Sequence, residues 1–363
     1  MSSNIKTAIS KVISGKDLDE SETSLIAEEM MSGLATQSQM GAFLTALRMK
    51  GETIDEIVGF ARAMRSRAEK INVTLPPNSP LLTDLCGTGG DALKTFNIST
   101  MSSFVVAGAG VPVAKHGNRS VTSKCGSADL LEKLGVNIRA TPNEVKRSIE
   151  LAGIGFMFAP TFHPATRHAS PTRSEIGIRT IFNVLGPLTC PAGARAQLVG
   201  VYDPGLVRKI AEVLQKLGVE SALVVHGDGG LDEISTFGNT FASRLHRDGR
   251  ISEELISPST FGLKATDYES VAAPERVEEY ALIALRLLSG RAKLTRNESA
   301  ILDMILANSA AAIVLSGKAR DYSEGVSLAR ESITSGNAMA KLSALVKHSR
   351  GDMSIVESFL MRV

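Results

Sequence analysis

A run of glycines at residues 87–90 constrains the fold of this chain more than any other feature. The apolar segment Leu81–Cys86 precedes it, and Asn97–Thr100 then opens a second apolar segment, Met101–Ala109. Glycine lacks a Cβ, so the backbone can turn tightly there and expose its N–H groups. The pattern predicts a strand, a glycine loop and a helix, an arrangement that binds anions and most naturally phosphate. Glycine-rich turns are common, so a purely structural loop also stays open.

Composition narrows the class of protein. The 363 residues are 43% hydrophobic, enough for a sizeable core and more than one domain. The net charge is only +2 and basic residues do not cluster, which argues against nucleic acid as a partner. The longest nearly apolar run, Met101–Ala114, is too short to span a membrane. We therefore expect no nucleic-acid partner and no membrane partner.

Three cysteines, Cys86, Cys125 and Cys190, lie far apart and form no C-x-x-C pair. They indicate neither a disulfide framework nor a zinc site. Residues 1–16 are polar and amphipathic and do not resemble a signal peptide. We expect a cytoplasmic protein in a reducing compartment.

The N-terminal residues have a helical pattern throughout. Capping-box pairs at Asp19/Glu22 and Thr53/Glu56 predict helix starts, and glycines follow the expected helix ends. A proline-rich break at 75–80 closes this region. We predict a small all-helical domain over residues 1–75.

Beyond the break, short apolar runs alternate with helical segments, which predicts a mainly parallel central sheet covered by helices. The runs are Val111–Ala114, Ile154–Ala159, Gln197–Tyr202 and Ser221–His226. Two further runs around Asp248-Gly249 predict a hairpin. The fold class is therefore α/β, with an α/β domain over residues 81–363.

Polar clusters follow several of these predicted strands, where open α/β sheets bind ligands. Asp232-Glu233 could bind magnesium together with a substrate phosphate, or could form a solvated loop. Lys115 and Arg119 could hold phosphate or be exposed. Arg173 or Arg179 could bind a carboxylate in a bidentate manner, or could pair within the protein. The residues alone leave these alternatives open.

Taken together, the motifs resemble the anthranilate phosphoribosyltransferase family. They occur in order as Gly87–Asp91, Asn97–Thr100, Lys115–Arg119, Cys125–Asp129, Gly177–Asn183 with Leu185–Leu188, and Gly230–Glu233. The likeness runs from about Ile9 to Leu345. It implies the nucleoside phosphorylase/phosphoribosyltransferase class fold, with a later segment, about 164–185, packing into the helical domain.

The resemblance also implies an activity in tryptophan biosynthesis. The enzyme would transfer the phosphoribosyl group of phosphoribosyl pyrophosphate to the amine of anthranilate, releasing pyrophosphate. It would use Mg2+ and form a homodimer through the helical domain. A pyrimidine nucleoside phosphorylase shares the architecture, and a phosphoribosyl-binding regulator without turnover is a second alternative. The motifs in Lys115–Asp129 favour the transferase over the phosphorylase, and Asp232, Glu233 and Arg173 argue against the regulator.

Site residues follow from the resemblance by motif. It implies contacts to phosphoribosyl pyrophosphate from Gly87, Gly90, Asp91, Thr95, Asn97, Ile98, Ser99, Thr100, Lys115, His116, Gly117, Asn118, Arg119, Ser120, Val121, Thr122, Ser123 and Ser127. It implies anthranilate contacts from Gly87, Asn118 and Arg173, and metal ligands from Ser99, Asp232 and Glu233. His116 is the one candidate for helping the amine lose its proton.

Overall fold

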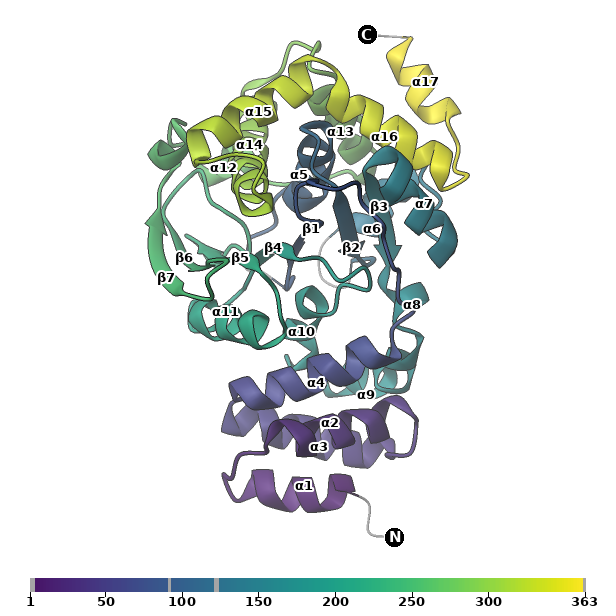
Figure 1. Ribbon diagram of the computed structural model, residues 1–363, viewed down its shortest axis with the longest axis vertical. Helices are drawn as coiled ribbons and strands as arrows, with labels where there is room; N and C mark the ends of the chain where they lie inside the picture. Colours follow the sequence, from purple (N-terminus) through teal and green to yellow (C-terminus); the bar gives the residue numbers. More distant parts are fainter. Residues whose placement is uncertain (1–3, 91–92, 121–123, 362–363) are drawn as a thin grey trace.

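The computed structural model describes residues 4–90, 93–120 and 124–361. Figure 1 shows a helical part that carries the N-terminus and a larger α/β part that carries the C-terminus. Among the described residues, the α-helices are α1 (Asn4–Ile13), α2 (Glu20–Met31), α3 (Gln37–Lys50), α4 (Ile54–Arg67), α5 (Ile98–Gly108), α6 (Ser127–Lys133), α7 (Pro142–Ala152), α8 (Ala159–Phe162), α9 (Ser170–Ile176), α10 (Phe182–Leu185), α11 (Leu206–Lys216), α12 (Tyr268–Val271), α13 (Val277–Ser289), α14 (Arg296–Ser316), α15 (Tyr322–Thr334), α16 (Asn337–His348) and α17 (Ser354–Leu360). Three short 3₁₀-helices are η1 (Pro164–His168), η2 (Gly186–Leu188) and η3 (Pro258–Phe261).

The predicted capping boxes set the starts of the N-terminal helices. The side chains of Asp19 and Thr53 accept hydrogen bonds from the N–H groups of Glu22 and Glu56, and the two glutamates reach back. Each box satisfies two backbone donors that a helix N-terminus would otherwise leave unpaired. Both predicted starts are therefore confirmed.

A later segment of the chain packs onto this helical part. The 3₁₀-helix η1 contacts α2, α9 contacts α3, and α10 contacts α4. Phe182 of α10 meets the ring of Phe60 edge-on, with centroids 5.9 Å apart, and Phe60 stacks on Phe43. The segment that follows β3 thus supplies part of the apolar core between the helices.

Across the described residues, the central sheet has seven strands in the order β3-β2-β1-β4-β5-β6-β7. The first five in this order run parallel, and β6 and β7 form an antiparallel hairpin at its edge. Their bounds are β1 (Thr83–Gly87), β2 (Val113–Gly117), β3 (Ile154–Phe158), β4 (Ala196–Gly200), β5 (Ser221–Gly227), β6 (Thr240–Leu245) and β7 (Ile251–Ile256). The mainly parallel sheet and the hairpin are confirmed.

Strand β2 extends further than its apolar pattern predicted. Lys115 and His116 belong to the strand and pair with Phe156 and Met157 of β3, although the predicted apolar run ended at Ala114. Backbone pairing between two buried strands outweighs the polarity of these two side chains. The polar residues are therefore held rigidly in the sheet.

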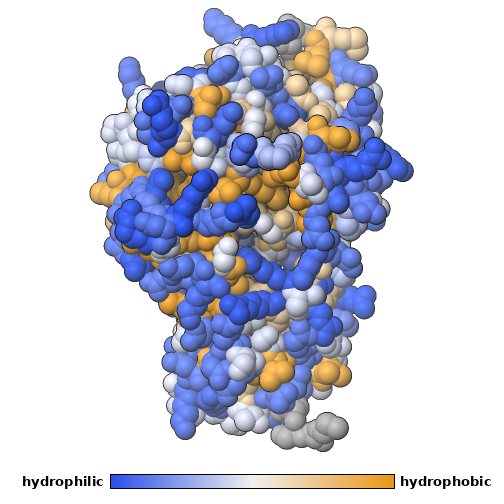
Figure 2. Space-filling view, in the orientation of Figure 1, coloured by the Kyte–Doolittle hydropathy of each residue, from blue (hydrophilic) through white to orange (hydrophobic). Residues whose placement is uncertain are grey.

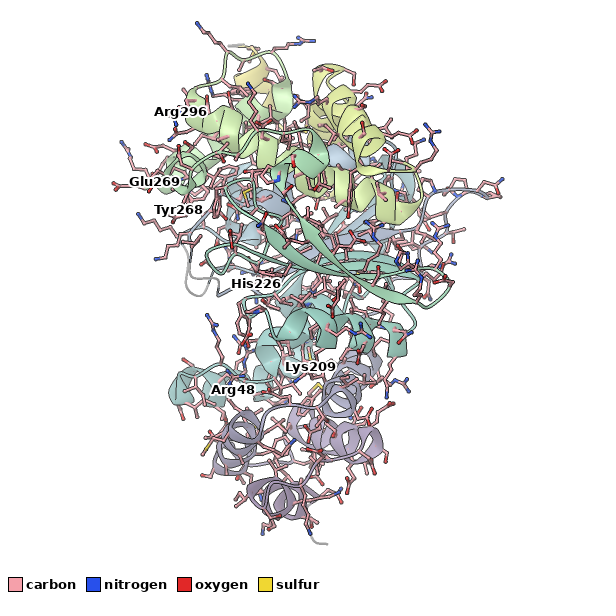
Figure 3. The ribbon with its side chains drawn as sticks, turned by 90° about the vertical axis from the view of Figure 1, so that its left-hand side faces the viewer. Arg48, Lys209, His226, Tyr268, Glu269 and Arg296 are labelled. Atoms are coloured by element: carbon pink, nitrogen blue, oxygen red, sulfur yellow. The ribbon has the colours of Figure 1, made fainter. Side chains whose placement is uncertain are left out.

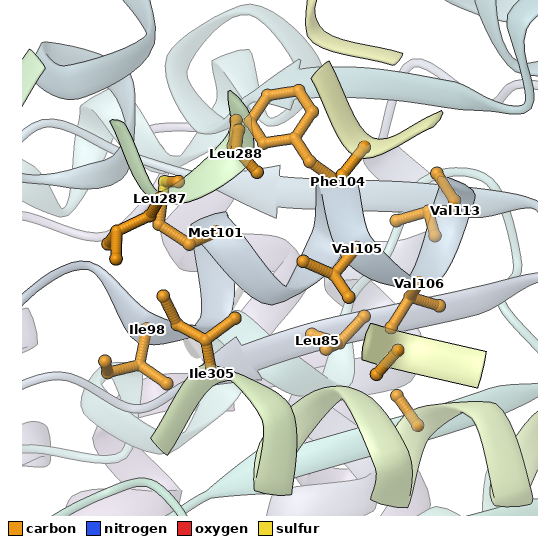
Figure 4. Close-up of a cluster of buried hydrophobic side chains, with 14 of the residues drawn as sticks. Leu85, Ile98, Met101, Phe104, Val105, Val106, Val113, Leu287, Leu288 and Ile305 are labelled. Atoms are coloured by element: carbon orange, nitrogen blue, oxygen red, sulfur yellow. The ribbon is translucent and has the colours of Figure 1, made fainter. Parts of the chain in front are cut away.

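Adjacent residues of the strands point into two different cores. Leu198 packs with α5 and α14, whereas Val199 packs with α11 and the N-terminal helices. Figure 4 shows the first core, where Leu85 and Val113 of the sheet meet Met101 and Phe104 of α5. Figure 2 shows hydrophobic residues in the middle of the larger part and a mostly hydrophilic surface on the helical part.

Polar contacts also join the two parts. Arg65 of α4 donates to the carbonyl oxygens of Leu188 and Leu217, at 2.7 and 3.1 Å. Lys209 of α11 donates to the carbonyl of Glu52 at 2.8 Å. Figure 3 shows Lys209 together with Arg48 at this junction. These contacts join the helical part to η2 and to α11 of the larger part.

Of the described helices, α14 alone is long and apolar enough to cross a membrane by length and composition. Most of its residues are buried inside the protein, where it packs against α5, α12 and α15. Core helices of soluble proteins pass the same test, so this feature is weak evidence for a membrane span.

Candidate functional site

The glycine loop after β1 lies against Asp232. The N–H of Gly89 donates to Oδ2 of Asp232 at 2.8 Å. A Cβ at Gly87 would lie 2.2 Å from the same oxygen, so no other residue fits at 87 without a shift of this carboxylate. Asp232 is 8% exposed, and its burial raises the pKa of its carboxyl. The loop and the carboxylate are therefore built around each other.

The first turn of α5 provides a second contact of the same kind. The N–H of Ser99 donates to Oε1 of Glu233 at 3.0 Å. Helix N-termini expose N–H groups and favour negative charge, so a carboxylate is stable there. The two neighbouring carboxylates thus make separate contacts. Asp232 accepts from the glycine loop, and Glu233 accepts from the first turn of α5.

These groups fit a hard divalent cation. Carboxylate and hydroxyl oxygens, such as those of Asp232, Glu233 and Ser99, are ligands that magnesium accepts, and magnesium takes few protein ligands while it keeps waters and substrate phosphates. Within the described ranges, no cluster of three or more His, Cys, Asp or Glu forms an all-protein metal cage. The donor set therefore suits magnesium shared with a phosphorylated substrate.

Other residues predicted to contact phosphoribosyl pyrophosphate lie near the start of α5. Ile98 and Thr100 are buried in its first turn, and Thr95 pairs with Ala272 in an isolated bridge just before it. The amide of Asn97 donates to the carbonyl of Cys125 at 3.1 Å, while its Oδ1 is buried without a hydrogen-bond partner. This unpaired acceptor lies between the α5 start and the loop before α6.

Lys115 and His116 are buried behind this edge of the sheet. The Lys115 residue is 4% exposed, and its ammonium donates to the carbonyls of Leu85 and His116, at 2.6 and 3.0 Å. Burial, with His163 and Lys115 nearby, lowers the pKa of His116 to about 3. An imidazole with that pKa is neutral and weakly basic, which argues against His116 as a proton acceptor.

Three buried groups in this region have atoms without hydrogen-bond partners. These atoms are Nε2 of His116, Nε2 of His163 and Oδ2 of Asp84. The centres of the two histidine rings lie 5.1 Å apart. The backbone N–H of His116 donates to Oδ1 of Asp84 at 3.3 Å. Burial lowers the pKa of His163 to about 4 and raises the pKa of Asp84 to about 6.

The loop after β2 is held by α6. Arg119 pairs with Asp129 and Glu132, at 2.8 and 2.9 Å. The N–H of Ser120 donates to Asp129, and the hydroxyl of Ser127 donates to the carbonyl of Asn118 at 3.1 Å. Gly117 is packed so closely on Ser127 that a Cβ would lie 2.1 Å from its hydroxyl. The charge of Arg119 is thus paired within the protein in this arrangement.

Four of the residues predicted to contact phosphoribosyl pyrophosphate lie outside the described residues. They are Asp91, Val121, Thr122 and Ser123. Gly90 is the last described residue before the first of these gaps.

Arg173 lies on α9, in the segment that packs onto the helical part. Its guanidinium lies 4.9 Å from the centre of the Phe182 ring. It makes no ion pair with a carboxylate in the described part of the chain, and burial lowers the pKa of this group. A half-buried guanidinium stacked on an aromatic face, with no acidic partner, can receive a planar carboxylate.

Arg179 is the alternative to Arg173 as a candidate for binding a carboxylate. It donates to the carbonyl of Gly90 and lies 4.1 Å above the ring of Tyr202. It therefore connects the segment of Arg173 to the glycine loop. The sequence carries no local signal for this contact, since the two ends are 89 residues apart.

A wide cavity of about 800 Å³ lies elsewhere, where α2 and α4 of the helical part face α11. Its charged side chains pair with one another, as Arg62 does with Glu20 at 2.7 Å and Lys216 does with Asp55 at 2.6 Å. Asp19 also lines it, and its carboxylate accepts hydrogen bonds as the cap of α2. The edge of the sheet around Gly87–Gly90 is the better site.

Comparisons with known proteins agree with this geometry. A model described as "Glycosyl transferase family, a/b domain" matches residues 79–339, and one described as "Glycosyl transferase family, helical bundle domain" matches residues 6–68. The chain is 48% identical to the anthranilate phosphoribosyltransferase of Pelotomaculum thermopropionicum, over 98% of this chain and 99% of that protein.

Two solved structures of similar proteins extend the match to the whole fold. The anthranilate phosphoribosyltransferase of Thermus thermophilus is 40% identical with a TM-score of 0.87, over 94% of this chain and 99% of that one. The Saccharomyces cerevisiae enzyme in complex with PRPP and Mg is 30% identical with a TM-score of 0.85, over 96% and 99%. The chain therefore belongs to the anthranilate phosphoribosyltransferase family, the glycosyl transferases that attach a phosphoribosyl group to anthranilate.

Proposed function

We propose that the glycine loop, the start of α5 and the carboxylates of Asp232 and Glu233 form the site for phosphoribosyl pyrophosphate and Mg2+. One observation carries this proposal: the carboxylates of Asp232 and Glu233 accept hydrogen bonds from two backbone N–H groups that favour anions, those of Gly89 and Ser99. Such N–H groups are a general binding site for phosphate. The structure of a yeast relative contains PRPP together with Mg, which supports the same pairing of ligands here.

Donor binding then requires an exchange of partners. The pyrophosphate of the donor competes for the N–H groups that Asp232 and Glu233 hold. In this exchange, the two carboxylates and the Ser99 hydroxyl would offer oxygen ligands to Mg2+. Magnesium at this position would neutralise the charge that develops on the leaving pyrophosphate.

The acceptor side is proposed around Arg173 and the exposed Asn118. The Arg173 guanidinium has no carboxylate partner among the described residues, so it can bind the carboxylate of anthranilate. A yeast relative solved with 4-fluoroanthranilate supports an acceptor of this class. Arg173 would orient the aryl amine toward the anomeric carbon of the donor.

The chemistry needs positioning more than a strong base. An aryl amine is largely neutral at pH 7, and holding two reactants in contact lowers the barrier substantially. Backbone N–H groups at the glycine loop would stabilise charge on the departing pyrophosphate. The low pKa of His116 is consistent with a reaction in which no side chain removes a proton early.

Fluorescence of anthranilate tests the proposed activity directly. The chain should consume anthranilate only when phosphoribosyl pyrophosphate and Mg2+ are both present, and pyrophosphate should appear in equal amount. A parallel reaction with uridine or thymidine and inorganic phosphate should give no free base. Turnover of the nucleoside, without turnover of anthranilate, would instead identify a pyrimidine nucleoside phosphorylase. Binding of the donor without any turnover would identify the regulator.

We also propose that the helical part forms a homodimer contact. Three apolar side chains on this part are strongly exposed: Ile13 at 70%, Leu34 at 76% and Met49 at 83%. Contiguous apolar surface favours association, and these side chains would contribute to such a surface. Sedimentation at micromolar concentration should give twice the chain mass of 38.5 kDa. A Met49→Glu, Leu34→Glu double variant should shift the protein toward monomer, whereas a strictly monomeric wild type would exclude the contact.

The remaining assignments are proposals of the same kind. We propose a division into a helical domain of residues 1–75, with 164–185 packing into it, and an α/β domain of residues 81–363. The three free cysteines favour a reducing compartment, and we propose a cytoplasmic enzyme.

A further inference from the structure

Arg179 makes two contacts that join distant parts of the chain. Its guanidinium donates to the carbonyl oxygen of Gly90, the last described residue of the glycine loop before the gap at 91–92. The same group lies 4.1 Å from the centre of the Tyr202 ring. Among the described residues, no carboxylate forms an ion pair with it. An otherwise exposed arginine is thus held by a carbonyl and an aromatic face.

Tyr202 is itself fixed to the glycine loop. Its N–H donates to the hydroxyl of Thr88 at 3.2 Å, and the N–H of Thr88 donates to the carbonyl of Gly200 at 2.9 Å. Tyr202, on whose ring Arg179 stacks, is therefore connected to both β4 and the glycine loop. Arg179 contacts this unit at two points, Gly90 and Tyr202.

The segment that carries Arg179 also carries Arg173. Helix α9 ends at Gly177, whose left-handed conformation turns the chain toward α10. The N–H of Thr180 then donates to the side chain of Asn183 at 3.0 Å at the start of α10. Arg179 thus projects from a short, defined connection that lies directly after the helix of Arg173.

We propose that Arg179 is a positioning residue that holds the acceptor-binding segment at a fixed place relative to the donor-binding glycine loop. The inference rests on the proposed function, because it assigns the donor to the loop and the acceptor to Arg173. Arg179 contacts neither reacting group. It acts through Gly90 and Tyr202.

Arginine suits this role better than lysine does. Its guanidinium is planar, so one face can stack on an aromatic ring while the edge donates a hydrogen bond in the plane. A lysine ammonium has the same charge but cannot make both contacts in this geometry. A second cation, Arg48 of α3, also acts electrostatically on Tyr202. Glu52 and Asp203 act on the same residue with the opposite sign.

The test separates binding of one substrate from alignment of both. Arg179→Ala should lower kcat about tenfold, while the Kd for phosphoribosyl pyrophosphate with Mg2+, measured by calorimetry without acceptor, changes less than about threefold. Arg179→Lys should recover only part of kcat. Tyr202→Leu should reproduce the loss, whereas Tyr202→Phe, which keeps the ring face, should stay within about threefold of wild type.

A double variant decides whether the two residues act as one unit. Arg179→Ala combined with Tyr202→Leu should be no slower than the worse single variant, because both remove the same contact. Arg167→Ala is the matched control, since Arg167 is an exposed arginine of the same segment whose side chain, within the described residues, donates only to the adjacent His168. Its kcat should equal that of wild type.

Three outcomes would overturn the inference. A rise in the donor Kd as large as the fall in kcat would mean that Arg179 contacts the donor directly. Losses that multiply in the double variant would mean that Arg179 and Tyr202 act independently. Unchanged kcat in Arg179→Ala would mean that the contact does not position anything. A wild type without anthranilate turnover would instead refute the proposed function, which keeps the two failures distinguishable.

Discussion

The two sides of the proposed site differ in how their charges are satisfied. On the donor side, the anion-binding N–H groups of Gly89 and Ser99 already hold Asp232 and Glu233. On the acceptor side, Arg173 rests on the ring of Phe182 without a carboxylate partner in the described part of the chain. If the proposed sites are right, donor binding exchanges partners, whereas acceptor binding only adds one. Removing a charged side chain from the donor side should therefore affect binding differently from removing one from the acceptor side.

The largest effect should come from the carboxylate pair. Asp232→Ala combined with Glu233→Ala should reduce anthranilate turnover by about a thousandfold or more, because several kcal/mol of charge stabilisation at the leaving group are lost. Binding of inorganic pyrophosphate without metal should change in the opposite direction and become tighter, since the Gly89 and Ser99 N–H groups no longer hold a carboxylate. Steady-state fluorescence and calorimetry in a chelating buffer measure the two effects.

Asp228→Asn is the matched control for that pair, because Asp228 is an exposed carboxylate of the turn that leads to Asp232. It should keep both turnover and metal-free pyrophosphate binding close to wild type. Near-normal turnover of the double variant at limiting magnesium would refute the metal role. Weaker pyrophosphate binding without metal would refute the exchange of partners.

The next largest effect should come from Arg173. A charge-assisted pair with the anthranilate carboxylate contributes about 1.5–3 kcal/mol, so Arg173→Ala should weaken anthranilate use by about ten- to a hundredfold. Arg173→Lys should rescue only part of this, since it keeps the charge but loses the planar fork. The KM for phosphoribosyl pyrophosphate should change little. If that KM rises while the anthranilate KM does not, Arg173 belongs to the donor side.

Much of the fold was readable because its signals are local. The capping box of Asp19 and Glu22 lies within four residues, and the hairpin turn at Asp248-Gly249 lies between two apolar runs. Each signal acts over a few residues, so the sequence states it directly. The extent of β2 was misjudged because pairing with β3, not the polarity of Lys115 and His116, decides it.

The contacts of the site depend on distant residues. Gly89 and Asp232 are 143 residues apart, and Ser99 and Glu233 are 134 residues apart. A pattern could predict that both ends lie at one sheet edge, but not that a carboxylate would accept from the loop itself. For the same reason, the residues could not decide between Arg173 and Arg179. Only the fold shows that one stacks on Phe182 and the other reaches Gly90.

Protonation of the buried histidines and of Asp84 should change the stability of the fold in opposite directions. His163, with its pKa lowered to about 4, stabilises the fold fully above about pH 6.5 and loses that contribution as the pH falls, because only the unfolded chain then binds the proton. Asp84, with its pKa raised to about 6, binds a proton in the folded state and offsets part of this loss below about pH 6. His116 behaves as His163 does.

Urea unfolding between about pH 5.5 and 4.5 measures the balance, at about 1.4 kcal/mol per pH unit for each net proton. Relative to wild type, His163→Gln should flatten the fall in unfolding free energy by about one such proton. Asp84→Asn should steepen it. Slopes that match wild type in both variants would show that these groups do not differ in proton affinity between the folded and unfolded states.

The smallest effect should come from a neutral hydrogen bond at the rim of the donor side. Thr88 accepts from the N–H of Tyr202 at 3.2 Å, and a neutral hydrogen bond contributes about 0.5–1.5 kcal/mol. Thr88→Val removes the acceptor but keeps the shape, so the KM for phosphoribosyl pyrophosphate should rise by about two- to tenfold, far less than on loss of the carboxylates. Thr88→Ser keeps the hydroxyl and should match wild type. A loss in Thr88→Val as large as that in the Asp232/Glu233 variant would mean that the loop is held chiefly from the β4 side, and the contrast between the two sides would then rest on Tyr202 rather than on the carboxylates.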